Sequence, residues 1–310
     1  MASSIPTLLR ANETTSIETS IILALELTLG IAGVIGNTIV CATIIGAKML
    51  HNKTNFLLFC LASADLIVCS LAIALNTHTN EVISQHTLIK LESDTLGNII
   101  CREILCRLIV NKYIFWACCD SSINFLVAVT FERYLAIVHP FLYRRFFTFS
   151  RLCYLIVLIW LWSFAEEIYL PILFRYDSPS LACTYEAPNE VLKICLPIWG
   201  YVVTFCIPLI ALLFMYLRII FKIRASSEKH RRESRNTSAE QLSSASKKVV
   251  NILLSVTIAY VIFWTPCQIM FLLSYSDAVK ISDRSNMLAQ SMIILPGVST
   301  ISKRNYVCLL

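Results

Sequence analysis

The sequence predicts an all-α fold, a polytopic membrane bundle of seven transmembrane helices of which the seventh is short. Hydrophobic residues make up 57% of the 310-residue chain and charged residues only 15%, with a mean hydropathy of +0.69. A soluble globular protein has about 45–50% apolar and about 25% charged residues, so this surplus of apolar residues is too large for a surface covered by water. The composition excludes a disordered chain, a small disulfide scaffold and a nucleic-acid-binding module.

Six apolar stretches are long enough to cross the hydrocarbon core of a bilayer, which takes about 20 residues of helix. They are residues 21–47, 55–76, 105–138, 152–174, 192–221 and 249–274. A seventh stretch, 287–301, is shorter and more polar. The sequence therefore predicts an extracellular N-terminal tail over 1–20, a seven-helix transmembrane domain over 21–301 and a short cytoplasmic tail over 302–310.

The basic residues in the connections set the orientation. With the N-terminus outside, Lys and Arg in the inward connections outnumber those in the outward segments by about two to one, which agrees with the positive-inside rule. Asn12 then lies outside, within the N-glycan acceptor pattern Asn12-Glu13-Thr14. The connection over 222–248 is Ser-rich and basic without an apolar period, which indicates a mobile cytoplasmic loop. We expect a multi-pass protein of the plasma membrane.

The six long spans also carry motifs that follow one another in a fixed order. They are Gly36-Asn37 in the first span, Leu61-Ala62-Ser63-Ala64-Asp65-Leu66 in the second, Glu132-Arg133-Tyr134 in the third, Trp160 with Ser163 in the fourth, Pro208 with Tyr216 in the fifth, and Phe263-Trp264-Thr265-Pro266 in the sixth. With these motifs the chain resembles the rhodopsin-like (class A) G-protein-coupled receptors over about residues 20–275. The resemblance implies a cell-surface receptor that binds an extracellular ligand and activates a heterotrimeric G protein.

Asp65 lies near the middle of the second span, where a lone carboxylate costs about 2.5–3.5 kcal/mol on insertion scales. It must therefore face a polar interior, and Asn37 and Ser122 are the expected partners. The resemblance implies that this acid binds a sodium ion that favours the inactive state, and no other metal or cofactor is expected. The alternative is a polar contact between helices without an ion, because the Asn that the family carries in its seventh span is missing here.

The motif Glu132-Arg133-Tyr134 lies at the inner end of the third span. Taken alone, an Arg at this place is most often an anchor at the membrane interface. The resemblance implies a switch, in which Arg133 pairs with Glu132 at rest and is released to meet Tyr216 and the G protein. A swing of the inner half of the sixth helix then opens a coupling pocket. The residues expected to line that pocket are Arg133, Tyr216, Val250 and Leu253.

The outer half of the bundle offers a mixed aromatic and amide lining for a ligand. The candidate ligand-binding residues are Asn111, Phe115, Cys119, Tyr201, Thr204, Trp264, Gln268 and Phe271. Phe115 occupies the place where receptors for charged amines carry an Asp, so a peptide or a neutral organic ligand is favoured over a monoamine, and a peptide is preferred. Asp120 lies about 140° away from Phe115 around the helix and is interpreted as a structural group beside Glu166 or Trp160. Retinal is not expected, because its Schiff base needs a Lys in the seventh span and 287–301 contains none.

Most of the 13 cysteines lie inside the spans, where a free Cys behaves as a small apolar residue. The resemblance implies one disulfide between the start of the third helix and the second outer loop, here Cys106–Cys183. Cys101 is an alternative partner, and two unpaired thiols are a further alternative. Cys106 lies 27 residues before Arg133, two more than is usual in the family, so we expect the helix to be locally irregular or to start differently.

Two other functions stay open. Leu295-Pro296-Gly297 and the residues that follow do not match the Asn-Pro…Tyr motif of the family's seventh span, which favours a non-signalling ligand-binding or dimer-partner variant. A small transporter is less favoured, because we find no repeat between the two halves of the chain.

An enzyme is not expected, since the sequence has no phosphate loop and no His-Glu-x-x-His motif. Arrestin and kinases are further expected partners at the third cytoplasmic loop, where Arg231-Arg232-Glu233-Ser234 resembles a kinase site.

Overall fold

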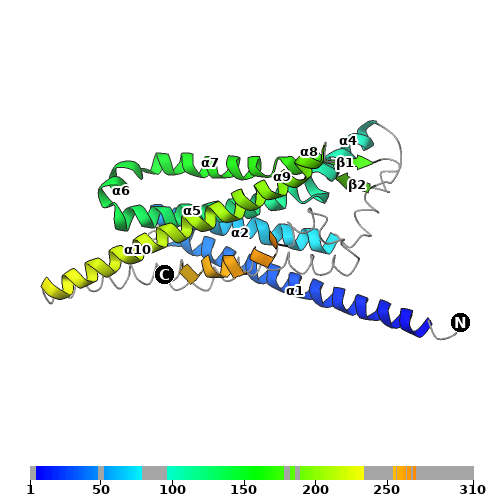
Figure 1. Ribbon diagram of the computed structural model, residues 1–310, viewed down its shortest axis with the longest axis horizontal. Coiled ribbons are helices and arrows are strands. Elements are labelled where there is room, and N and C mark those ends of the chain that lie inside the picture. The colour runs from blue at the N-terminus through cyan, green and yellow to red at the C-terminus, as the bar shows by residue number, and fades with distance from the viewer. Residues whose placement is uncertain are drawn as a thin grey trace.

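The computed structural model describes residues 5–47, 52–78, 96–177, 182–185, 189–233, 254–255, 257–262, 264–266 and 268–269. These residues form an elongated bundle of helices with a small two-stranded sheet near one end (Figure 1). We call this the hairpin end, and the opposite end, where α6 (Pro140–Phe146) lies, the α6 end. Outside the described residues lie the predicted seventh span over 287–301, the tail over 302–310, Val250, Leu253 and Phe271.

The first two helices pack along each other. α1 (Ile5–Gly46) begins within the segment that the sequence assigned to the N-terminal tail, with Pro6 in its first turn, where the missing N–H of proline removes no helical hydrogen bond. α2 (Lys53–His78) covers the second predicted span. The two helices come close at Gly30, where an added Cβ would lie 2.7 Å from Cγ1 of Ile73. A residue without a side chain is what allows this approach.

The third span is interrupted near its outer end. α4 (Leu96–Leu105) leads into the π-helical turn η2 (Cys106–Val110), and α5 (Tyr113–Val138) begins after a break at Asn111 and Lys112. The φ of Lys112 is 60°, a left-handed conformation in which a right-handed helix cannot continue. A π turn and a break accommodate additional residues, so the structure contains the irregularity that the long spacing before Arg133 led us to expect.

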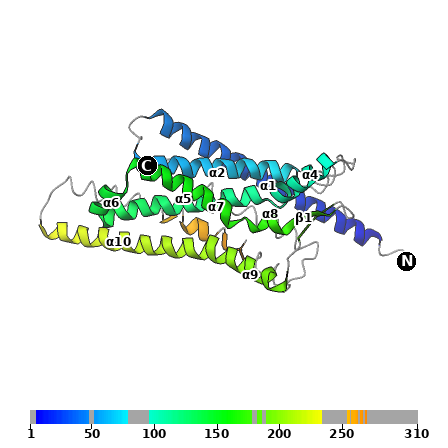
Figure 2. The same cartoon turned by 90° about the horizontal axis from the view of Figure 1, so that it is seen from above.

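α5 is the central helix of the bundle. It contacts α2 on one side, and α7 (Phe149–Glu166) and α10 (Ile207–Glu233) on others, and most of its residues are buried. Seen from above, α1 and α2 lie on one side of α5 and α10 on the other (Figure 2). A helix enclosed in this way can hold polar side chains inside the bundle, away from lipid.

A short helix and a hairpin complete the hairpin end. α8 (Tyr169–Leu173) leads into β1 (Phe174–Asp177), which pairs antiparallel with β2 (Ala182–Tyr185) and places Tyr176 opposite Cys183. The predicted all-α class describes the bundle, and this two-stranded hairpin is an addition that the sequence did not suggest.

The fifth span consists of three segments, α9 (Glu190–Gly200), the π-helical η3 (Tyr201–Cys206) and α10. α10 continues to Glu233, twelve residues beyond the predicted end of the span at 221, so its last turns occupy the start of the predicted mobile loop over 222–248. Ala, Glu, Lys and Arg dominate these turns, and all four are strong helix formers. The lack of an apolar period after residue 221 led us to expect a loop there. It was a poor indicator, because a helical segment that extends into water needs no apolar face.

The described helices are those of a multi-pass membrane protein. Five segments are long and apolar enough to cross a bilayer: Leu27–Gly46, Lys53–Leu75, Ile100–Val138, Phe149–Leu173 and Ile194–Ala225. A shorter apolar helix, Thr257–Pro266, represents the sixth predicted span. Large apolar side chains such as Leu161 and Ile210 point out of the bundle and are more than half exposed, which is unfavourable in water and favourable in lipid.

Substitution of Gly30 by Leu should destabilise the contact between α1 and α2. The new side chain would overlap Ile73, and such overpacking typically costs about 1–3 kcal/mol. We expect a lower midpoint of thermal unfolding, measured by tryptophan fluorescence on the purified chain in detergent. Gly46→Leu is the matched control, because an added Cβ there has no heavy atom within 4 Å. Equal midpoints for the two variants would contradict the close approach.

Candidate functional site

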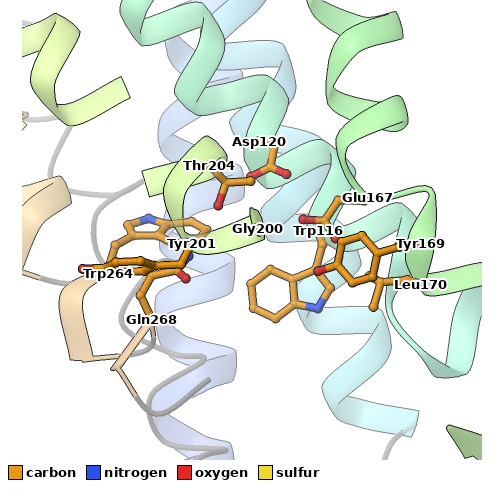
Figure 3. A pocket seen from close by; sticks show the side chains of 10 residues that line it. All are labelled: Trp116, Asp120, Glu167, Tyr169, Leu170, Gly200, Tyr201, Thr204, Trp264 and Gln268. Atoms are coloured by element: carbon orange, nitrogen blue, oxygen red, sulfur yellow. The ribbon is translucent and has the colours of Figure 1, made fainter. Parts of the chain in front are cut away.

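A cavity lies between α5, the junction of α7 with α8, η3 and the sixth span, on the side toward the hairpin end. The described residues that line it are Trp116, Asp120, Glu167, Tyr169, Leu170, Gly200, Tyr201, Thr204, Trp264 and Gln268. Trp264 and Tyr201 form one side, Tyr169 and Leu170 the other, and Trp116 lies between them (Figure 3). We call this the aromatic cavity, because four of its ten lining residues carry aromatic rings.

The π-helical turn η3 brings Tyr201 and Thr204 to the cavity wall. It ends two residues before Pro208, which has no N–H to donate to the carbonyl of Thr204, its regular partner in an α-helix. The hydroxyl of Tyr260 in the sixth span donates to this carbonyl at 3.2 Å. The carbonyl to which Pro208 cannot donate thus accepts a hydrogen bond that joins the fifth span to the sixth.

A row of aromatic rings connects the cavity to the core. The rings of Trp116 and Trp264 meet edge to face with their centroids 6.3 Å apart, and Trp264 lies 5.9 Å from Tyr260. Tyr260 in turn lies 5.7 Å from Phe205. Aromatic pairs at these distances attract each other by more than the burial of their surface accounts for. Movement of Trp264 would therefore change the packing of Tyr260.

The structure places seven of the eight predicted ligand-binding residues, in three kinds of position. Tyr201, Thr204, Trp264 and Gln268 line the aromatic cavity. Phe115 and Cys119 are buried in the adjoining core cluster with Tyr260 and Trp264. Asn111 lies at the break before α5, where its side-chain oxygen accepts a hydrogen bond from the amide of Tyr113 at 2.9 Å. Phe271 lies outside the described residues.

Asp65 is buried between α2 and α5, and the hydroxyl of Ser122 donates to its carboxylate. The third predicted member, Asn37, is also buried, and its amide donates to the carbonyl of Gly33 in its own helix at 3.0 Å. A hard cation such as sodium takes oxygen ligands, and the carboxylate of Asp65 and the hydroxyl of Ser122 are of that type. These two residues therefore fit the sodium site that the resemblance implies.

At the α6 end, Arg133 is ion-paired with Glu132, with 2.8 Å between Nε and Oε2. The side chain of Glu132 is 1% exposed and that of Arg133 27% exposed. The other oxygen of Glu132 accepts a hydrogen bond from the hydroxyl of Thr54 in α2 at 2.9 Å. Tyr143 in α6 is close enough that burial, together with the charge of Glu132, raises the pKa of its phenol to about 12. Glu132 is thus held from α2 while it holds Arg133.

Tyr216 joins three spans near the same end. It is fully buried, and its hydroxyl lies 3.1 Å from the hydroxyl of Thr130 in α5. Thr257 in the sixth span donates to it at 3.0 Å. Tyr134 points elsewhere, with its hydroxyl 3.1 Å from Nε2 of His139. Tyr216 therefore stabilises the contact between the fifth and sixth spans instead of meeting Arg133.

The predicted disulfide is confirmed, since Cys106 and Cys183 are joined across 77 residues with their Cα atoms 5.6 Å apart. The bond ties the π turn before α5 to the hairpin. Tyr176 packs beside it, and the buried guanidinium of Arg102 donates to the hydroxyl of Tyr176 at 3.2 Å. Cys101, the alternative partner, is a free and exposed thiol.

Comparison with known proteins decides the family. The model of the family "7 transmembrane receptor (rhodopsin family)" matches residues 36–299, most of the chain. The chain belongs to the rhodopsin family of seven-transmembrane receptors. The family resemblance drawn from the six motifs is thereby confirmed.

Several curated receptors are similar to this one. A neuromedin U receptor homolog, nmur-2, of Caenorhabditis elegans is 28% identical, over 87% of this chain and 70% of its own length. The D(2) dopamine receptor A of Xenopus laevis is 29% identical over 62% of this chain, and the tachykinin-like peptides receptor 86C of Drosophila melanogaster 27% identical over 78%. The chain spans only 38% and 46% of the lengths of these last two relatives.

Asp120 lies near Glu166, one of the two neighbours expected from the sequence, and also near a second acid. Its side chain lines the aromatic cavity of the receptor and is hydrogen-bonded to that of Glu167, which the sequence analysis did not single out. Trp116 and Tyr169 were missed as well. The signal was present, since acids inside apolar spans are costly and mark functional positions. α7 contacts α5 and ends at Glu166, and Glu167 is its C-cap residue, so the second acid lies at the end of the helix that faces Asp120.

Removal of the disulfide should destabilise the receptor. Cys183→Ser opens a loop of 77 residues, and loss of a native disulfide typically costs about 2–5 kcal/mol. We expect a clear drop in the thermal unfolding midpoint of the purified protein. Cys101→Ser is the control and should change the midpoint little, because Cys101 is free and exposed. Reduction of the unmutated receptor should reproduce the Cys183→Ser value, and a larger drop from Cys101→Ser would contradict the assignment.

Proposed function

We propose that this receptor binds an extracellular ligand in the aromatic cavity and activates a heterotrimeric G protein at the α6 end. The observation that carries the proposal is the ion pair of Arg133 with the buried carboxylate of Glu132. It lies at the far end of α5, the same helix that supplies Trp116 and Asp120 to the cavity. A ligand that favours one arrangement of the helices around α5 can therefore bias the state of Arg133.

The sixth span is the element that would move. Pro266 lacks the N–H for one helical hydrogen bond, so the helix can bend there. Trp264 senses the ligand from the cavity wall, and Thr257 holds the inner half of the span to Tyr216. On activation this contact opens, which frees the hydroxyl of Tyr216 to meet a released Arg133. The G protein would then insert where the inner half of the span had packed.

A peptide is the ligand class we propose. Two of the relatives are named for peptides, the neuromedin U receptor homolog and the tachykinin-like peptides receptor. The dopamine receptor among the relatives supports a monoamine as the second candidate. Phe115, at the place where receptors for charged amines carry an Asp, is buried in the core cluster and offers no charge to such a ligand.

We further propose that the N-terminus is extracellular, that the plasma membrane is the site of action, and that arrestin and kinases act on the third cytoplasmic loop.

We also propose that Asp65 and Ser122 hold a sodium ion that stabilises the resting state. The support is the buried contact between carboxylate and hydroxyl. Asp65→Asn should abolish any sodium dependence of the thermal unfolding midpoint, measured against potassium at equal ionic strength.

The activity test uses the full chain in lipid nanodiscs and a panel of purified G-protein heterotrimers. Glu132→Gln removes the charge that holds Arg133, so basal nucleotide exchange should rise about two- to tenfold on at least one heterotrimer, in line with about 0.5–1.5 kcal/mol for one bond. Adding Arg133→Ala to that variant should abolish the rise. If neither the unmutated receptor nor Glu132→Gln stimulates nucleotide exchange on any heterotrimer, the result would favour the non-signalling ligand-binding or dimer-partner function.

A second prediction concerns Thr54, whose hydroxyl bonds to Glu132 from α2. Thr54→Val keeps the shape of the side chain but removes this donor, so Glu132 should hold Arg133 less firmly. We expect a rise in basal exchange smaller than that of Glu132→Gln, in the same nanodisc assay. Thr43→Val is the matched control, because the hydroxyl of Thr43 bonds within α1, to the carbonyl of Ile39, and has no other hydrogen bond among the described residues. A rise of equal size in both variants would argue against the role of Thr54.

A further inference from the structure

We propose that Asp120 and Glu167 form a cation site in the aromatic cavity, which recognises an ammonium or guanidinium group of the ligand. This inference rests on the proposed function, because it identifies the chemistry of the ligand that the cavity binds. It differs from the arrangement in which an acid at the position of Phe115 holds a charged amine. Here the acids come from further along α5 and from the end of α7.

The first support is the pairing of the two acids. Asp120 is 4% exposed and Glu167 7% exposed, and their side chains are hydrogen-bonded to each other. A hydrogen bond between two carboxyl groups needs a proton on one of them. With the second group ionised, the pair carries a single negative charge, which one monovalent cation neutralises without any change in the shared proton.

The second support is an oxygen without a partner. Oδ2 of Asp120 is buried and accepts no hydrogen bond from the described part of the chain, although the Asp120 side chain lines the cavity. Glu167 has two hydrogen-bond partners, because the side chains of Tyr169 and Asp120 both bond to it. A buried acceptor left without a donor is destabilising. An N–H group of a ligand would supply the missing donor and a positive charge together.

The third support is the composition of the wall. The rings of Trp116, Tyr169, Tyr201 and Trp264 surround the space beside the acids (Figure 3). Aromatic faces attract cations, and the attraction grows when the cation is removed from water. Among the described lining residues there is no Lys, Arg or His to neutralise the acids. Carboxyl groups enclosed by aromatic rings favour a cation over a neutral or an anionic group.

The test measures the binding of small probes to the purified full chain in nanodiscs, without G protein. N-acetylarginine amide is compared with its neutral citrulline counterpart, and benzylammonium with benzyl alcohol, by ligand-observed NMR. We expect the charged member of at least one pair to bind about tenfold more tightly, as loss of one charge-assisted bond predicts. A preference in the first pair alone indicates a peptide side chain, and in the second alone a small amine.

Asp120→Asn and Glu167→Gln should each reduce this preference about tenfold, and a cooperative thermal unfolding transition shows that the variants are folded. Glu103→Gln is the control, because Glu103 is ion-paired with Arg107 and does not line the cavity. It should keep the full preference. Equal binding of charged and neutral probes to the unmutated receptor would overturn the cation site, as would a preference that survives both substitutions. Neither result would touch the exchange assay, so failure here is distinct from failure of the proposed function.

Discussion

Polar side chains inside a hydrocarbon layer must find partners among themselves, and the rest of this structure depends on that constraint. Asp65 is met by Ser122, and Glu132 by Thr54 and Arg133. Each of these contacts joins α5 to α2, or lies within α5 and is supported from α2. The cost of an unpaired group therefore fixes how these two helices face each other.

α5 contributes side chains to both the aromatic cavity and the α6 end of the molecule. Its first turns supply Trp116 and Asp120 to the aromatic cavity, and its last turns carry Glu132 and Arg133. The polar contacts around α5 differ in kind. Those to α2 are buried and charged, whereas the contact of Tyr216 with the sixth span is a bond between neutral hydroxyls. Bonds to charged groups are stronger than neutral ones, so the bond between Tyr216 and Thr257 is easier to break than those that α5 makes to α2.

The sequence allowed the spans to be predicted from apolar length and the family from motif order, and the disulfide then followed from what the family resemblance implies. The aromatic cavity could be predicted only in part. Tyr201 and Thr204 were identified, but Asp120 was assigned to a helix contact, since helical phase gives the direction of a side chain and not what lies opposite. The end of α7 at Glu167 and the π turns depend on tertiary packing, which no local pattern encodes.

The carbonyl of Thr204 illustrates how a backbone defect can be put to use. Because the hydroxyl of Tyr260 reaches a main-chain oxygen, any amino acid at position 204 would present the same acceptor. This tether between neighbouring helices is consequently insensitive to replacement of the residue that carries it. It depends instead on Pro208, which has no N–H to compete for this carbonyl, so the side chain that position 204 presents to the cavity can vary without loss of the contact.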